Sequence, residues 1–140
     1  MNTAASLLIA TSSAILLVLG LAHLFFTFRG PKLLPRDQVL QSRMQEVSPG
    51  ITKQTTMWRA WIGFNASHSV GLVMFGAVFG YLAIFRESIL FESSYLRILG
   101  FLVLGGYILL AKKYFFRTPY RASLLAGVLY ASAIALAASQ

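Results

Sequence analysis

Four apolar stretches, each long enough to cross a lipid bilayer, constrain this chain more than any other feature. They cover residues 4–28, 59–85, 95–116 and 119–139. A transmembrane helix needs about 20 predominantly apolar residues. Of the whole chain, 57% is hydrophobic and only 11% is charged, with a mean hydropathy of +0.70. Soluble domains do not have this balance. We therefore predict an all-α, integral membrane four-helix bundle that forms a single domain over residues 1–140.

The first and third stretches need separate arguments. The first has no basic segment before it and, at about 25 residues, is too long for a signal-peptide core, so we expect it to remain as a span. In the third, only Ile98–Ala111 is uncharged. About 14 residues cover roughly 21 Å at 1.5 Å per residue, so this stretch crosses the membrane only if Arg97, Lys112 and Lys113 extend toward the surface.

The basic residues predict an orientation. They are concentrated between the first two stretches and again between the last two, whereas Arg86 is offset by Glu87 and Glu92. The positive-inside rule then places the first and third connections in the cytoplasm and both termini on the outer side. Trp58 and Trp61 are predicted interface anchors, because Trp gathers at membrane surfaces.

The first connection, residues 29–58, contains a helical signal. Asp37 is a good N-cap, and Leu40, Met44 and Val47 recur at helical spacing before the turn residues 48–50. We predict a short amphipathic helix lying on the inner membrane surface. We also expect Asp37 to pair with nearby bases of the same motif, namely Arg29, Arg36 and Arg59.

Three further patterns concern helix ends and packing. Thr118 followed by Pro119 predicts an N-cap and the first residue of the last helix. Gly63, Ser67 and Gly71 form a ridge of small residues, which predicts that the second span is packed on both sides. The segment "GAVFG" at 76–80 matches a helix-packing pattern, although this chain has 11 glycines.

Two spans place polar residues deep in apolar surroundings. His23 and Asn65 each lie six residues inside the basic residue that ends their span, and His68 lies nine inside. The similar depths predict one cluster of four residues, His23, Asn65, His68 and Ser69. The simplest interpretation is hydrogen bonding between helices, but polar groups inside a membrane also indicate a functional site.

Several kinds of ligand suit this cluster to different degrees. A pocket for a lipophilic small molecule, such as a quinone, an isoprenoid or a lipid, is the first alternative. A bis-histidine haem b is less favoured, because similar depth and small residues predict helices in close contact rather than a gap for a macrocycle. Two histidines without a carboxylate or thiolate leave a metal shell unfilled, so no metal and no cofactor is predicted.

The composition excludes other functions. The chain has no Cys, which excludes a disulfide framework, a thiolate metal site and a dithiol redox centre. The formal net charge of +8 lies between apolar runs rather than along one face of a soluble domain, so we predict no nucleic-acid partner. The expected partners are the lipid bilayer and a larger membrane complex or a lipophilic small molecule.

Two motifs resemble those of a known family. The segments "TFRGPKLLPRD" (27–37) and "TTMWRAWIGFNASHSVG" (55–71) are similar to a TFRG-x-KL-x-PRD loop and a W-R-x-W-x-GFN-x-SHS-x-G helix. These motifs occur in a family of small, uncharacterised bacterial inner-membrane proteins with four helices. The resemblance covers about a third of the chain and implies a bacterial membrane location and four helices, but it supplies no reaction. It points to residues His23, Arg29, Lys32, Pro35, Arg36, Asp37, Trp58, Arg59, Trp61, Asn65, Ser67, His68 and Gly71.

The function predicted from the sequence is a non-enzymatic binding or accessory component of the inner membrane, with no catalytic residue assigned. Its cytoplasmic contact surface is the basic connection that contains Arg29, Lys32 and Arg36. The alternative is a small membrane enzyme or carrier for a lipophilic substrate, in which His68 is a general acid or base oriented by Asn65.

Overall fold

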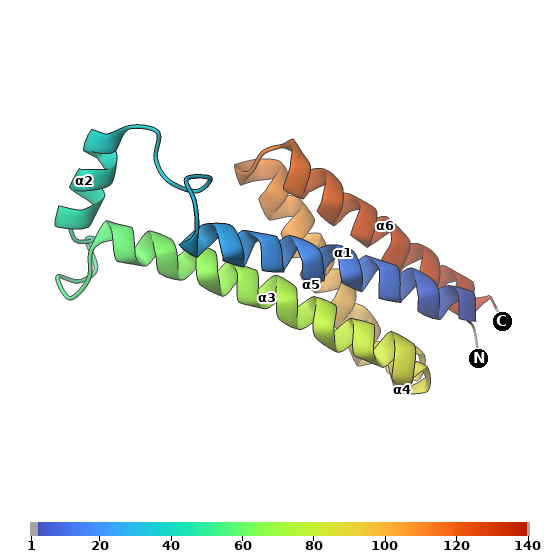
Figure 1. Ribbon diagram of the computed structural model, residues 1–140. Coiled ribbons are helices and arrows are strands. Elements are labelled where there is room, and N and C mark those ends of the chain that lie inside the picture. The colour runs from blue at the N-terminus through green and yellow to red at the C-terminus, as the bar shows by residue number, and fades with distance from the viewer. Residues whose placement is uncertain (1–2, 140) are drawn as a thin grey trace. The chain divides into compact units, whose positions relative to one another are not determined.

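The computed structural model describes residues 3–139 of the chain. It is 82% helical, and no strand occurs among these residues. The described helices are α1 (Thr3–Phe28), α2 (Gln38–Glu46), α3 (Met57–Phe85), α4 (Glu87–Glu92), α5 (Ser94–Tyr114) and α6 (Arg117–Ala138) (Figure 1).

Within this described range, four helices are long and apolar enough to cross a membrane: α1, α3, α5 and α6. The shortest, α5, has 21 residues, which is about 32 Å at 1.5 Å per residue and matches a hydrocarbon core of about 30 Å. It reaches this length by including the charged residues at both of its ends. The predicted four-helix membrane architecture is confirmed, and the chain is a multi-pass membrane protein.

The chain divides into two compact units. Unit 1 combines residues 3–19 with 72–139, and unit 2 consists of residues 20–71. Unit 1 thus contains α4, α5 and α6 with parts of α1 and α3, and unit 2 contains α2 with the remaining parts of α1 and α3. A single domain over the whole chain stays a prediction.

The core of unit 1 is built around Tyr130 of α6, whose side chain is fully buried. Its hydroxyl donates to the backbone oxygen of Arg97 in α5 at 3.2 Å. Gly100 makes this possible, because a Cβ at that position would overlap the Tyr130 hydroxyl. The rings of Phe79 and Phe101 meet the tyrosine ring edge to face, with centroids 5.9 and 5.1 Å away. These contacts hold α5 and α6 side by side (Figure 1).

In the same unit, α1 and α3 approach closely at a glycine. A Cβ on Gly76 would lie 2.7 Å from the carbonyl oxygen of Ser13 and 2.8 Å from the backbone nitrogen of Leu17. A Cβ on Gly80 would lie 3.5 Å from that of Ser13. The two glycines of the segment at 76–80 therefore face α1, and at Gly76 any larger residue would push the backbones apart.

The small residues in the first part of α3 are not used in this way. A Cβ on Gly63 would meet no atom within 4 Å. Ser67 is exposed, and the neighbouring Phe64 is 75% exposed. The prediction that this helix is packed on both sides is therefore wrong for its first half, because small residues permit a close approach but do not cause one.

Two element boundaries also differ from the prediction. α6 begins at Arg117 without a side-chain cap, so Thr118 is inside the first turn and is not the N-cap. Pro119 still lies in that turn, where a missing N–H costs no helical hydrogen bond. The second connection, for which no helix was predicted, contains the short helix α4, whose Leu90 is fully buried in unit 1.

The predicted helix in the first connection is present as α2 in unit 2. The Asp37 carboxylate accepts hydrogen bonds from the backbone N–H groups of Val39 (2.8 Å) and Leu40 (3.3 Å). It thereby satisfies two of the donors that the start of a helix leaves without a partner. Val47 ends the helix, and its carbonyl accepts from the N–H of Met57 at 2.8 Å, which joins the end of α2 to the start of α3.

Candidate functional site

The polar cluster of unit 2 centres on a hydrogen bond between His23 of α1 and Asn65 of α3. The His23 Nε2 atom lies 3.1 Å from Asn65 Oδ1. The Asn65 Nδ2 group donates to the backbone oxygen of Trp61 at 2.8 Å, which orients the carboxamide. Since its Oδ1 can only accept, the proton of this bond belongs to His23 Nε2. In the neutral ring Nδ1 is then the acceptor nitrogen.

His68 completes the cluster from α3, one turn beyond Asn65. Its ring meets that of His23 edge to face, with centroids 5.4 Å apart and planes at 73°. The structure thus brings together His23, Asn65 and His68, as the depth count suggested. The bonds of the Asn65 carboxamide go to His23 and to the backbone of Trp61, so they do not support the hypothesis that Asn65 orients His68.

Ser69 is fully buried, but its hydroxyl serves the backbone rather than a histidine. Ser69 Oγ donates to the carbonyl oxygen of Asn65 at 2.8 Å. Thr27 does the same on α1, where its hydroxyl donates to the carbonyl oxygen of His23 at 2.8 Å. A hydroxyl one turn after His23 and another one turn after Asn65 thus bond the backbone carbonyls of these two residues. Such bonds between residues i and i−4 can be anticipated from spacing alone, yet Thr27 was not among the predicted cluster residues.

The two tryptophans at the start of α3 differ in their roles. The indole N–H of Trp61 donates to the backbone oxygen of Leu33 at 3.2 Å, which fastens the connecting segment to α3. In the same segment the Lys32 ammonium lies over the Phe26 ring, 3.9 Å from its centroid. Trp58 is half-buried. Trp61 thus holds the connecting segment through its indole, and its backbone oxygen accepts the hydrogen bond from Asn65 of the polar cluster.

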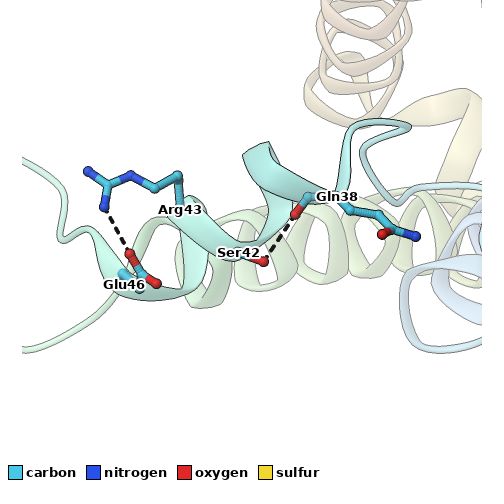
Figure 2. Close-up of polar contacts among 4 residues, drawn as sticks. All are labelled: Gln38, Ser42, Arg43 and Glu46. Atoms are coloured by element: carbon cyan, nitrogen blue, oxygen red, sulfur yellow. Dashed lines mark hydrogen bonds and ion pairs between the residues drawn. The ribbon is translucent and has the colours of Figure 1, made fainter.

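Charge in unit 2 is unbalanced. Residues 29–59 contain six basic and two acidic residues, a net charge of +4 (six minus two). The one ion pair found within residues 3–139 joins Arg43 to Glu46 at 2.9 Å on the exposed surface of α2, beside the Ser42 to Gln38 bond (Figure 2). The bases outside this pair are Arg29, Lys32, Arg36, Lys53 and Arg59.

The expected ion-pair network around Asp37 is therefore wrong. Its carboxylate accepts from the N–H groups at the start of α2, whereas Arg29, Arg36 and Arg59 are exposed. A local cap competes well here, because it uses two adjacent backbone donors and orders no long side chain. An exposed ion pair with Arg contributes little, since it must immobilise both partners in water.

The geometry also bears on metal and haem ligation. No group of three or more His, Cys, Asp or Glu residues suited to a metal ion occurs in the described range. The His23 and His68 rings contact each other directly, and the Nε2 of His23 is already bonded to Asn65. Two axial histidines must instead face the iron from opposite sides of the macrocycle. Ligation of haem here requires the rings to separate and the Asn65 bond to break.

Comparison with models of protein families, with curated proteins and with solved structures found no match to this chain.

Proposed function

We propose that this chain is a non-enzymatic binding or accessory protein of the bacterial inner membrane. The connection between α1 and α3 lies on its cytoplasmic side, and both termini lie on its periplasmic side. The observation that supports this orientation best is the net charge of +4 on residues 29–59. Short connections rich in Lys and Arg remain in the cytoplasm. The resemblance at residues 27–37 and 55–71 supports a bacterial protein.

The partner that this connection fits best is the anionic surface of the inner leaflet. No residue of α2 is buried, and Val39 and Leu40 are 71% and 51% exposed. A short helix that combines exposed apolar residues with neighbouring bases suits the boundary between headgroups and acyl chains. Each Lys or Arg near an anionic surface contributes about 1 kcal/mol. The same charge also suits an acidic face of a larger membrane complex.

Reconstitution into nanodiscs separates these partners. Because the chain has no Cys, a Gln45→Cys variant labelled with an environment-sensitive fluorophore reports on α2 alone. We expect a blue shift when anionic phosphatidylglycerol is added to phosphatidylcholine, and its loss at high salt, which screens exposed charges. Equal emission in both lipids would contradict lipid binding and favour an acidic protein partner.

Two charge variants sharpen this experiment. The double variant Arg36→Gln, Lys53→Gln removes two bases that pair with no carboxylate in the described structure, so it should remove most of the shift. Arg43→Gln is the matched control, since the charge of Arg43 is already opposed by Glu46 at 2.9 Å. If the double variant and Arg43→Gln reduce the shift equally, the unpaired charge is not what binds the membrane.

A second candidate function is the binding or conversion of a lipophilic small molecule at His23 and His68. It is favoured by the hydrogen bond that fixes the proton on Nε2 of His23, because the neutral ring then keeps Nδ1 as an acceptor. Native mass spectrometry in a mild detergent tests it. A retained quinone, isoprenoid or haem mass should disappear in His23→Gln and persist in Ser67→Ala, a control on an exposed residue of α3.

A further inference from the structure

A cleft of about 530 Å³ lies in unit 1, where α1 begins and α3 ends. Its volume is in the range of small-molecule sites, roughly 300–1,000 Å³. The wall is apolar along one part, formed by Leu7, Ala10, Ile84 and Phe85. Since Ala10 lies seven residues inside the start of α1, this part reaches about 10 Å toward the hydrocarbon.

The other part of the wall carries two opposite charges, where α3 ends. Arg86 and Glu87 both line the cleft. Ser6 of α1 donates its hydroxyl to Glu87 Oε2 at 2.6 Å, a short charge-assisted bond that positions the carboxylate. Neither charge has an ion-pair partner within residues 3–139, where the pair found is Arg43 with Glu46. Oε1 of Glu87 and the guanidinium of Arg86 remain for a ligand.

We infer that this cleft binds one phospholipid with a primary-amine headgroup, of the phosphatidylethanolamine type. The ammonium donates to Glu87, the phosphate accepts from Arg86, and an acyl chain lies along the apolar wall. The lipid is zwitterionic, as is the cleft with its one Arg and one Glu. A choline headgroup has no N–H to donate to Glu87, and the headgroup of phosphatidylglycerol carries no cation to pair with it.

This inference concerns a different part of the molecule from the proposed function. Residues 29–59 are expected to attract anionic headgroups through many exposed charges, with little selectivity beyond charge. The cleft is instead expected to select one neutral headgroup through two side chains. The two ideas therefore fail independently of each other.

The test is native mass spectrometry of the full chain in a mild detergent. Phosphatidylethanolamine, phosphatidylcholine and phosphatidylglycerol with identical acyl chains are added in turn. We expect phosphatidylethanolamine to bind about tenfold more tightly than the other two, as a bond to a buried or half-buried charge allows. Glu87→Gln should abolish this preference, and Arg86→Gln should weaken the retention of all three lipids, because each of them carries the phosphate.

Two further variants guard against trivial explanations. Glu92→Gln removes an acid of α4 that does not line the cleft, so it should bind lipid as the parent chain does. Ala10→Leu fills the apolar wall and should reduce retention of all three lipids. Equal retention of the three lipids by the parent chain, or identical behaviour of Glu87→Gln and Glu92→Gln, would overturn the inference. The comparison of Glu87→Gln with Glu92→Gln does not depend on Ala10→Leu, so it decides the question even if Ala10→Leu fails to fold.

Discussion

At the scale of the residue, Asn65 organises the polar cluster of unit 2. Its carboxamide accepts from His23 of α1 and donates to the backbone of Trp61 in its own helix. One side chain thus links two helices and fixes the tautomer of a histidine. Such bonds between helices contribute on the order of 1 kcal/mol in a membrane.

Substitution of Asn65 by Leu should therefore change His23 more than it changes the fold. Leu has the same number and branching of side-chain heavy atoms but no acceptor, so the neutral imidazole of His23 is no longer held with its proton on Nε2. The nitrogen chemical shifts of His23, measured by NMR in alkaline buffer, should move from one tautomer toward a mixture. The free energy of unfolding should fall by about 1 kcal/mol.

Ser67→Ala is the matched control for this prediction. Ser67 lies on α3 two residues beyond Asn65, is exposed, and donates only to the carbonyl oxygen of Phe64 at 3.0 Å. Its loss should leave the His23 spectrum as it is in the parent chain. If Asn65→Leu also leaves the His23 shifts unchanged, the hydrogen bond does not determine the tautomer.

At the scale of the element, α2 illustrates how local chemistry decides a helix start. A helix of nine residues is marginal by itself, so the cap at Asp37 matters. Asp37→Ala should cost about 1 kcal/mol, and the backbone amides of Val39 and Leu40 should exchange with deuterium about fivefold faster. Asp37→Asn keeps the acceptor and should change exchange by less than twofold. A large effect of Asp37→Asn would instead favour ion pairing.

The contact between α1 and α3 in unit 1 supports a second prediction for elements. Gly76→Val should destabilise the protein by about 1–3 kcal/mol, because the added side chain meets the backbone of α1. Gly63→Val makes the same change of helix propensity in the same helix, where the Cβ meets nothing within 4 Å. Unfolding in mixed micelles should therefore distinguish the two variants. Equal stabilities would show that α1 and α3 do not pack closely at Gly76.

At the scale of the whole molecule, charge rather than packing predicts how the chain crosses the membrane. The spans are insensitive to direction, since apolar helices of this length suit either orientation. The bias comes from the bases at 29–59 and 112–121, set against one Arg and two Glu at 86–92. That bias supports cytoplasmic first and third connections.

Cysteine labelling tests this orientation without interference, because the chain has no Cys of its own. Ser139→Cys and Gln45→Cys each place one thiol at an exposed position. A membrane-impermeant maleimide added to intact spheroplasts should label the thiol at 139 and should reach the one at 45 only after permeabilisation. The reverse pattern would show that the basic connection lies outside.

The sequence by itself determined the spans and the location of α2. These properties depend on transfer from water to lipid, which is additive along the chain, or on neighbours within one helical turn, as for the cap at Asp37. The helix α4 was missed because its short apolar centre lies between Glu87 and Glu92 and has no length or period to identify it.

Only the tertiary structure decided which long-range partners meet. The bond from Ser6 to Glu87 joins residues 81 positions apart. Whether Gly76 or Gly63 is the glycine at which α3 packs closely against α1 depends on how the two helices are rotated about their axes. In lipid, apolar side chains gain little by turning toward another helix, so small differences in packing and hydrogen bonding fix that rotation. A sequence pattern shows which residues permit such contacts, whereas the three-dimensional arrangement selects those that form.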